Sequence, residues 1–574
     1  MQKIQSTYNR KVIYWIKDAW FLAAPYWTSA EKYKSGVLLG IVILFNLLAV
    51  YMTVVFNEWY NGFYDAIQHF NKPVFVAAIY KFLVLAFFYI LFQILAYYFR
   101  KILEIRWRRW STRYYLDNWF NHQSYYKTRF LERIGDNPDQ RISEDVNSFI
   151  VLFLDFTLGI LNASVSLVSF IVILWTISGT LDFTFRGYHI NIHGYMVYAA
   201  IIYSIIGTYI TFKIGKPLIK LDFQQQAYEA DFRYGLLRVR EYGENIAFYK
   251  GEHQEKAALM LRFNNVVNNF VAIIYRQMKI DIFGVGYGQL AKIFPMIVAS
   301  PRYFAKVIQL GDLVQIGYAF DHVQSALSYF INAYSSLSGW RAIMDRLYGF
   351  QAMVNEADNL AGLPINIGDN YLELKNISVN LPSGAKLLYN INLCLKSGDR
   401  LLIRGASGSG KTTLLRVVAG LWPFAQGQLY QKNGLTSMFI TQKPYLPEGS
   451  LKNAICYPKI EGLPQDQILI ELLKSCGLAH LGSQLDIISD WSNKFSGGEQ
   501  QKIAFCRVLV NSPDIVYLDE ATSALDEESE ELMYNMLIDK LPRSVIVSVG
   551  HRSTIKRWHT QELDFNTLLT TVKV

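Results

Sequence analysis

The sequence predicts two parts, an α-helical membrane domain of six transmembrane helices and a C-terminal soluble α/β domain with a phosphate-binding loop. Three observations predict this. The first part holds six apolar segments near bilayer-crossing length, long basic stretches separate some of them, and a glycine-rich loop follows an apolar run in the last third. We expect the membrane domain over residues 1–350, a linker over 351–369 and the α/β domain over 370–574.

The composition fits a membrane protein. Of 574 residues, 52% are hydrophobic and only 18% are charged, whereas soluble proteins carry about 25% charged residues. The net charge of +9 comes largely from basic residues that flank apolar segments, which fits the positive-inside rule, so no nucleic-acid partner is expected. The four cysteines all lie in the last third without a C-x-x-C pair, and this predicts neither a disulfide framework nor a zinc site.

The six apolar segments set the topology. The fifth is interrupted by charged residues and by Pro295. The N-terminal segment and the connections at 100–147 and 213–279 are long and basic, while the opposite connections are short and carry few basic residues. This asymmetry puts both termini and the α/β domain in the cytosol. The predicted spans are residues 36–56, 75–99, 149–178, 195–212, 280–299 and 313–337.

The glycine-rich loop at 405–412 reads G-A-S-G-S-G-K-T and lies between an apolar strand and an apolar helix. Glycines let successive backbone N–H groups turn inward and cradle phosphates at a helix N-terminus. Lys411 is expected to reach the β and γ phosphates, and the Thr412 hydroxyl to ligate Mg²⁺. The residues expected to hold the phosphates are Gly405, Ala406, Ser407, Gly408, Ser409, Gly410, Lys411, Thr412 and Thr413.

A second apolar strand, at 515–518, ends in two acids. Asp519 is expected to hold Mg²⁺, and Glu520 to orient and polarise the attacking water. The alternative, a solvated acidic turn, is disfavoured by the phosphate loop in the same domain.

Ser496-Gly497-Gly498-Glu499-Gln500 resembles the signature of the ABC ATPases, in which the signature of one domain caps the γ-phosphate held by another. The resemblance covers about residues 370–560 and implies ATP and Mg²⁺ as cofactors. It implies catalytic roles for Glu520, His551 and Lys411, with His551 matching the switch histidine. It adds Gln442, Ser496, Gly497, Gly498, Glu499 and Asp526 to the ATP-binding residues, and Gln442 to the magnesium residues Thr412 and Asp519.

Two positions depart from the family pattern. Phe495 replaces the usual leucine before the signature. The position where the family often stacks adenine on an aromatic ring is Leu381. Either adenine stacking is weaker here or Tyr371 or Tyr389 substitutes, and the adenine contact stays unassigned.

Residues 244–252, which read E-N-I-A-F-Y-K-G-E, resemble an element of subfamily D transporters, as do residues 107–112 and 137–142. Early segments at 25–27 and 57–64 are most similar to bacterial SbmA/BacA-type transporters with a fused ATPase. Subfamily D moves acyl-CoA or cobalamin across organelle membranes, so the resemblance implies a transporter of bulky amphipathic solutes.

A chain with one ATPase domain cannot complete an ATP site shared between two domains, so we expect a symmetric homodimer in the lipid bilayer. The predicted function is ATP-driven transport of a peptide, cobalamin or acyl-CoA solute, in a bacterial inner membrane. The alternative is a lipid flippase or a regulatory membrane ATPase, and the direction of transport does not follow from the residues.

The sixth span carries a polar stripe. At 100° per residue its polar side chains fall along one helix face, opposite Val323 and Leu327. A carboxylate facing lipid is costly, so this face is expected to line a solute path, with helix packing through serines as the alternative. The stripe consists of Asp321, Ser325, Ser328, Asn332 and Ser335, and His322, the neighbour of Asp321, is expected to line the path as well.

Overall fold

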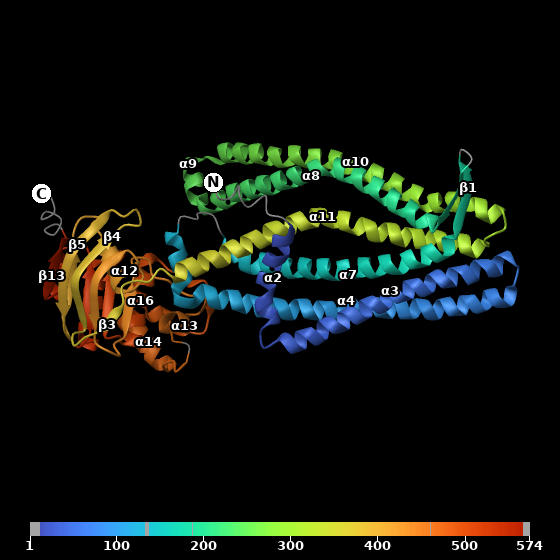
Figure 1. Cartoon of the computed structure of the whole chain (residues 1–574). Coiled ribbons are helices and arrows are strands. Elements are labelled where there is room, and N and C mark those ends of the chain that lie inside the picture. Colours follow the sequence, from blue (N-terminus) through green and yellow to red (C-terminus); the bar gives the residue numbers. More distant parts are fainter. Residues whose placement is uncertain (1–11, 132–136, 186–187, 460, 566–574) are drawn as a thin grey trace. The chain divides into compact units, whose positions relative to one another are not determined.

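The computed structural model describes residues 12–131, 137–185, 188–459 and 461–565. The chain forms two compact units (Figure 1). The helical unit comprises Met1–Asn118 and Gly135–Ala352, and the α/β unit comprises Trp119–Ile134 and Met353–Val574. Each unit is built on its own hydrophobic core.

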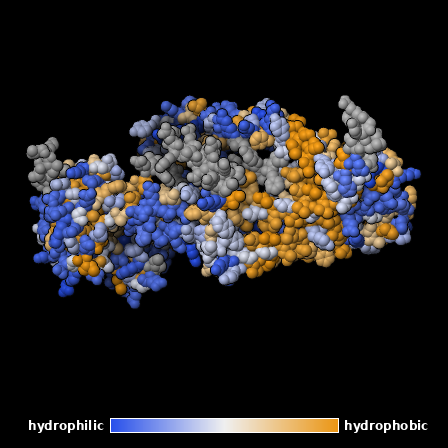
Figure 2. Space-filling model, viewed as in Figure 1, coloured by the Kyte–Doolittle hydropathy of each residue, from blue (hydrophilic) through white to orange (hydrophobic). Residues whose placement is uncertain are grey.

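Long helices make up the helical unit. Among the described residues, five of them are long and apolar enough to cross a membrane. These five are α3 (Lys32–Gln68), α4 (Lys72–Phe120), α7 (Val146–Ser178), α8 (Tyr195–Glu241) and α10 (Glu252–Phe304), and the shorter α2 (Val12–Trp27) precedes them. Their apolar side chains form a hydrophobic band over the unit (Figure 2).

The sixth predicted span lies in α11 (Leu310–Asp358), which is long but is not among those five helices. Polar residues such as Gln315, Asp321 and Gln324 interrupt its apolar sequence. The interrupted fifth span, in contrast, is one continuous helix, α10, which accommodates Pro295 and Pro301. By hydropathy, α10 is therefore apolar enough to cross a membrane and α11 is not among the helices that are, although it is the fifth span, in α10, that charged residues and Pro295 interrupt.

The helices continue well past the predicted spans. α8 and α10 form a hairpin whose tip is the short helix α9 (Gly243–Tyr249). At the opposite end of the unit, β1 (Thr180–Phe185) and β2 (Tyr188–His193) form an antiparallel hairpin, where only a short connection was predicted. α11 extends through Asp358, so its last turns occupy the start of the predicted linker.

Aromatic stacking holds α2 against α4. The Tyr26 and Trp107 rings stack with centroids 5.1 Å apart, and both side chains are fully buried. The Tyr26 hydroxyl hydrogen-bonds the Ser35 hydroxyl at the start of α3. The buried tyrosine therefore has a polar partner and connects three helices.

Two sheets form the base of the α/β unit. The parallel sheet has the order β13-β6-β12-β11-β8 and the other β3-β7-β4-β5. The first contains β6 (Arg400–Arg404), β8 (Ser437–Ile440), β11 (Ile515–Asp519), β12 (Val545–Val549) and β13 (Gln561–Asp564). The second contains β3 (Ile365–Ile367), β4 (Leu372–Asn380), β5 (Lys386–Leu395) and β7 (Ala425–Gln431).

The central strands β11 and β12 are buried almost throughout, which explains their continuous apolar sequence. Helices cover this sheet and form a second group beside it. They are α12 (Lys411–Val418), α13 (Leu451–Cys456), α14 (Asp466–Ser475), α15 (Trp491–Lys494), α16 (Gly497–Asn511) and α17 (Glu527–Lys540), with the two-residue strands β9 (Gly449–Ser450) and β10 (Ile488–Ser489) between them.

The segment Trp119–Ile134 belongs to the α/β unit although it lies within the range predicted for the membrane domain. It contains the short helix α5 (Ser124–Lys127). The Phe130 ring meets Trp422 edge-on at a centroid distance of 5.1 Å, and Phe424 at 5.8 Å. This aromatic contact joins a connection between two long helices to the core of the α/β unit.

Candidate nucleotide-binding site

The phosphate loop connects β6 to α12 in the predicted strand–loop–helix arrangement. Gly405, Gly408 and Gly410 have φ values of 155°, 78° and 97°, a backbone region that side chains rarely adopt. A Cβ atom at Gly405 would also lie 2.8 Å from Phe565. Glycine is therefore required here by the backbone and by the space around it.

Polar groups inside the loop suit phosphate. The Lys411 ammonium donates to the carbonyls of Gly405 and Ala406, at 2.8 Å each. The buried Ser409 hydroxyl has no hydrogen-bond partner among the described residues. Burial lowers the pKa of the Lys411 ammonium, and the Glu520 and Asp519 carboxylates oppose this. An anion with several acceptor oxygens would satisfy both side chains.

Thr412 and Asp519 meet at the end of β11. The Thr412 hydroxyl donates to Asp519 Oδ1 at 3.0 Å. Burial raises the pKa of the Asp519 carboxyl, while the hydrogen bond from Thr412 lowers it. Within the described residues there is no cluster of three or more histidine, cysteine or acidic side chains. A hydroxyl and one carboxylate instead match the oxygen ligands of Mg²⁺, which shares its shell with substrate phosphates and water.

Three neighbouring strand ends bring Gln442, Glu520 and His551 together, because β8, β11 and β12 are parallel and end at the same edge of the sheet. The Gln442 amide donates to Glu520 Oε2 at 3.0 Å, and His551 Nε2 lies 3.4 Å from Glu520 Oε1. The structure thus brings three of the predicted site residues into contact.

The Glu520 backbone is unusual. Its φ is 51°, in the left-handed region, and its N–H donates to the Val549 carbonyl at 3.0 Å. Non-glycine residues in this region are strained and gather at functional sites. The hydrogen bond to β12 holds the turn that presents the carboxylate.

The signature residues start α16 as a capping box. The Ser496 hydroxyl accepts from the Glu499 N–H at 3.3 Å, and Glu499 Oε2 accepts from the Ser496 N–H at 3.0 Å. This pair fixes the helix N-terminus. Phe495 is buried and stacks on Trp491 with centroids 5.0 Å apart, so the departure from leucine fills a core position.

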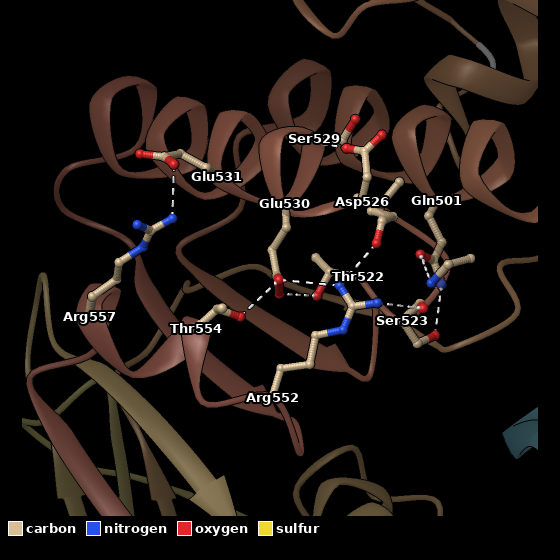
Figure 3. Close-up of polar contacts among 12 residues, drawn as sticks. Gln501, Thr522, Ser523, Asp526, Ser529, Glu530, Glu531, Arg552, Thr554 and Arg557 are labelled. Atoms are coloured by element: carbon tan, nitrogen blue, oxygen red, sulfur yellow. Dashed lines mark hydrogen bonds and ion pairs between the residues drawn. The ribbon is translucent and has the colours of Figure 1, made fainter.

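A buried polar network, not foreseen from the sequence, surrounds the segment 523–526 (Figure 3). Gln501 Nε2 donates to the Gln442 carbonyl at 2.9 Å and to the Ser523 hydroxyl at 3.2 Å, and Gln501 Oε1 accepts from the Ala524 N–H at 3.0 Å. One amide therefore connects the signature helix, the segment after β8 and the segment after β11.

Arg552, directly after His551, holds the same segment from the other side. Its guanidinium donates to the Leu525 carbonyl at 2.9 Å and to the Ser523 carbonyl at 3.1 Å. It also donates to the fully buried Glu530 at 3.3 Å, and Glu530 further accepts from the Thr522 and Thr554 hydroxyls (Figure 3). Asp526 caps α17 by accepting from the Ser529 N–H at 2.7 Å.

The aligned position and the two rings that could substitute for it lie in different surroundings. Leu381 lies after β4, and its N–H donates to the Ala385 carbonyl at 2.7 Å. Tyr371 is half-buried against the core of the unit. Tyr389 is exposed on β5, with the Lys386 ammonium 5.4 Å from its ring. No aromatic ring is singled out by this arrangement.

The polar stripe in α11 divides into two environments. Asp321 and Ser325 are exposed, while Val323 is buried in the helical core. His322 stacks on Phe170 at a centroid distance of 4.2 Å. Ser328 is half-buried and accepts from Gln324 at 3.2 Å. The side chains of Asn332 and Ser335 lie outside the described part of the chain.

The comparisons with known proteins agree with this geometry. The model of "ABC transporter transmembrane region 2" matches residues 24–304, and that of "ABC transporter" matches residues 388–523. An ABC transporter ATP-binding protein of Haemophilus influenzae is 36% identical over 96% of this chain and 93% of its own length.

The chain belongs to the ABC transporter family. It joins a membrane region and an ATPase domain in one polypeptide, and its relatives include subfamily D members, as its sequence motifs indicated. The chloroplastic ABC transporter D family member 2 of Arabidopsis thaliana is 31% identical over 96% of this chain and 86% of its own length.

A bacterial relative and a solved structure complete the comparison. The inner membrane ABC transporter ATP-binding protein YddA of Escherichia coli is 33% identical over 92% of this transporter and 94% of its own length. A bacterial Atm1-family exporter with ATP bound superposes with a TM-score of 0.68 at 19% identity, covering 92% of this chain and 93% of that one. This last likeness concerns the fold alone. The ABC transporter thus binds ATP and spans a membrane, as predicted.

Proposed function

We propose that this ABC transporter is a homodimer that uses ATP and Mg²⁺ to move a bulky amphipathic solute across a bacterial inner membrane. The observation that carries the proposal is the convergence of Gln442, Glu520 and His551 beside the phosphate loop. The membrane assignment is supported by the spans and by the Escherichia coli relative, which is an inner membrane protein.

In this proposal, different residues of the ATP site bind the phosphates, hold Mg²⁺ and position the attacking water. The loop N–H groups, Lys411 and the Ser409 hydroxyl bind the phosphates, while Thr412, Asp519 and Gln442 hold Mg²⁺. When bound, Mg²⁺ neutralises charge that develops on the phosphates. Glu520 orients the attacking water and accepts its proton, and His551, which lies 3.4 Å from that carboxylate, contacts the γ-phosphate.

Two chains complete each site in this proposal. Ser496, Gly497, Gly498 and Glu499 of one chain cap the γ-phosphate bound to the phosphate loop of the partner, with Asp526 beside them. The capping box supports this role, since it uses the Ser496 and Glu499 N–H groups to fix the start of α16, while the Gly497 and Gly498 N–H groups take no part in it and are directed along the helix axis toward an anion.

The expected effect of Glu520→Gln tests the catalytic assignment. The amide keeps the shape of the side chain but cannot accept the proton, so turnover should fall by about 10²–10⁴ while ATP binding persists. Steady-state hydrolysis and nucleotide binding by the purified dimer measure the two quantities. Near-normal hydrolysis would remove Glu520 from the role of general base.

The solute path runs along the polar stripe of α11 in this proposal, with Asp321, His322, Ser325, Ser328, Asn332 and Ser335 as its residues. Cysteines at Ser325, Ser328 and Asn332, in a chain without the native cysteines, should react with a water-soluble thiol reagent, and ATP trapping should change their rates. Cysteines at Leu327 and Phe330 are the matched controls. Reactivity confined to these controls would show that the opposite face lines the path.

A further inference from the structure

Gln501, on the signature helix α16, has a buried amide whose nitrogen and oxygen both have partners. The residue is 1% exposed. Its nitrogen donates to the Gln442 carbonyl and to the Ser523 hydroxyl, and its oxygen accepts from the Ala524 N–H. A carbonyl only accepts and a backbone N–H only donates, so these partners fix which way the amide faces. The position therefore requires a side chain that carries both a donor and an acceptor.

The contact with Gln442 leads to the Glu520 carboxylate. Gln501 holds the Gln442 backbone, and the Gln442 side-chain amide donates to Glu520 Oε2 at 3.0 Å. Residues 441–443 are all exposed, so packing contributes little to holding this segment. The hydrogen bond from a buried amide therefore restrains where the Gln442 side chain meets the carboxylate.

The other two contacts hold the turn that follows Glu520. This residue has a φ of 51°, and such a strained conformation persists only where the surrounding structure restrains it. The Ser523 N–H donates to the Glu520 carbonyl at 3.1 Å and closes the turn. Gln501 binds both Ser523 and Ala524. Glu520 is thus restrained from two sides, its backbone through the turn and its carboxylate through Gln442.

α16 gives Gln501 a rigid support. The capping box fixes the first turn of this helix. Ile503 and Phe505, which follow Gln501, are fully buried in the core of the α/β unit. A group on a packed helix positions its partners better than a group on a loop does. Gln501 is therefore a fixed point to which two loops of the ATP site are attached.

We propose that Gln501 is a positioning residue for ATP hydrolysis, which holds the Glu520 carboxylate where it accepts the proton of the attacking water. It acts through Gln442 and through the turn at Ser523. The proposal rests on the role of Glu520 given under the proposed function, and it adds a residue that the phosphate loop and the acidic strand end do not include.

Gln501→Met tests the proposal in the purified full-length dimer. Methionine keeps the length of the side chain but removes the amide donor and acceptor. A misplacement of about 1 Å slows a reaction about 10²-fold, so kcat should fall about 10–100-fold. Among the described residues Gln501 makes no hydrogen bond to the phosphate loop, so the Kd for ATP should stay near the wild-type value. Expressing each rate per bound ATP removes the contribution of misfolded protein.

Asn511→Leu is the matched control. Asn511 ends the same helix, about 15 Å further along its axis. Its amide donates to the Arg507 and Tyr457 carbonyls, at 2.9 and 3.2 Å. The variant therefore also removes two hydrogen bonds of an amide on α16, but it leaves the contacts of Gln501 in place and should keep the wild-type kcat. An equal fall in kcat for both variants would contradict the role of Gln501.

The effect of Gln501→Met should depend on Glu520. In a Glu520→Gln chain the general base is already absent, so adding Gln501→Met should slow single-turnover hydrolysis about threefold at most, because residues that act as a unit have non-additive effects. The same fold-loss in both backgrounds would show that Gln501 acts on packing alone and would overturn the proposal. If Gln501→Met does not bind ATP, Gln501→Asn takes its place, because an amide one methylene shorter does not reach Gln442 and Ala524 together.

The two proposals fail in different ways. Wild-type hydrolysis by Gln501→Met, with slow hydrolysis by Glu520→Gln, would overturn this inference and leave the proposed function standing. Near-normal hydrolysis by Glu520→Gln alone would remove the base that Gln501 is proposed to position, and would therefore refute the catalytic assignment itself.

Discussion

The α/β unit, here called the ATPase unit, and the helical unit, here called the membrane unit, each bury a polar side chain, but with different numbers of hydrogen-bond partners. In the ATPase unit, the carboxylate of Glu530 is fully buried and accepts from Arg552, Thr522 and Thr554. In the membrane unit, the amide of Asn57 is also fully buried. Within the described residues it donates to the Gln315 backbone carbonyl at 3.0 Å and accepts from the Gln315 side-chain amide at 2.9 Å.

The two sets of hydrogen bonds differ because the Glu530 side chain is charged and the Asn57 side chain is neutral. A buried charge requires several donors, so its network reaches the segments that carry Ser523 and His551. A neutral amide requires fewer partners and connects only two helices.

The largest effect is expected in the buried network of the ATPase unit. Glu530→Leu removes the acceptor of three donors and leaves Arg552 without its carboxylate, which should cost about 3 kcal/mol, the low end for a broken buried pair, because Arg552 is half-exposed. Thermal unfolding of the full-length protein measures the loss.

Glu531→Leu is the matched control for this variant (Figure 3). Glu531 is the next residue on the same helix, and its ion pair with Arg557 at 2.9 Å is half-exposed on both sides. Its loss should cost less than about 1 kcal/mol. Similar midpoints for the two variants would contradict the special role of the buried network.

A smaller effect is expected in the membrane unit. Asn57→Leu removes both hydrogen bonds, whereas Gln315→Leu removes only the one from its side-chain amide. The coupling energy of the two changes in a double-mutant cycle should be about 0.6 kcal/mol, with roughly 1.7 as an upper value. The free energies of unfolding of the wild type, the two single variants and the double variant, measured in mild detergent, give this coupling energy. A coupling energy as large as the Glu530 effect would remove the contrast between the units.

The sequence predicts the parts of the ATP site that lie in short contiguous motifs. The phosphate loop and the acidic end of β11 each combine a strand or helix end with characteristic residues, so their spacing places them, and the signature is placed by its resemblance to the ABC ATPases. Gln501 and Glu530 have no such motif. Their roles arise from contacts with Ser523 and Arg552, at least 22 positions away in the sequence, and only the folded chain shows these contacts.

The membrane unit is predictable at a coarser level. Hydropathy locates the spans, and helical periodicity places Asp321 and Val323 on different faces, as observed. It does not show that His322 packs on Phe170 or that the segment of Phe130 joins the ATPase unit. These contacts depend on which neighbouring helix or core is present, which a single-helix pattern does not contain.

The most direct test of the central claim, an ATP site shared between two chains, compares two mixed dimers isolated through different affinity tags. With Lys411→Ala in one chain and Ser496→Arg in the other, one site keeps both its phosphate loop and its signature. With both changes in the same chain, each site loses one of the two. The shared-site account predicts clear ATP hydrolysis by the first dimer and little by the second, while equal rates would contradict it.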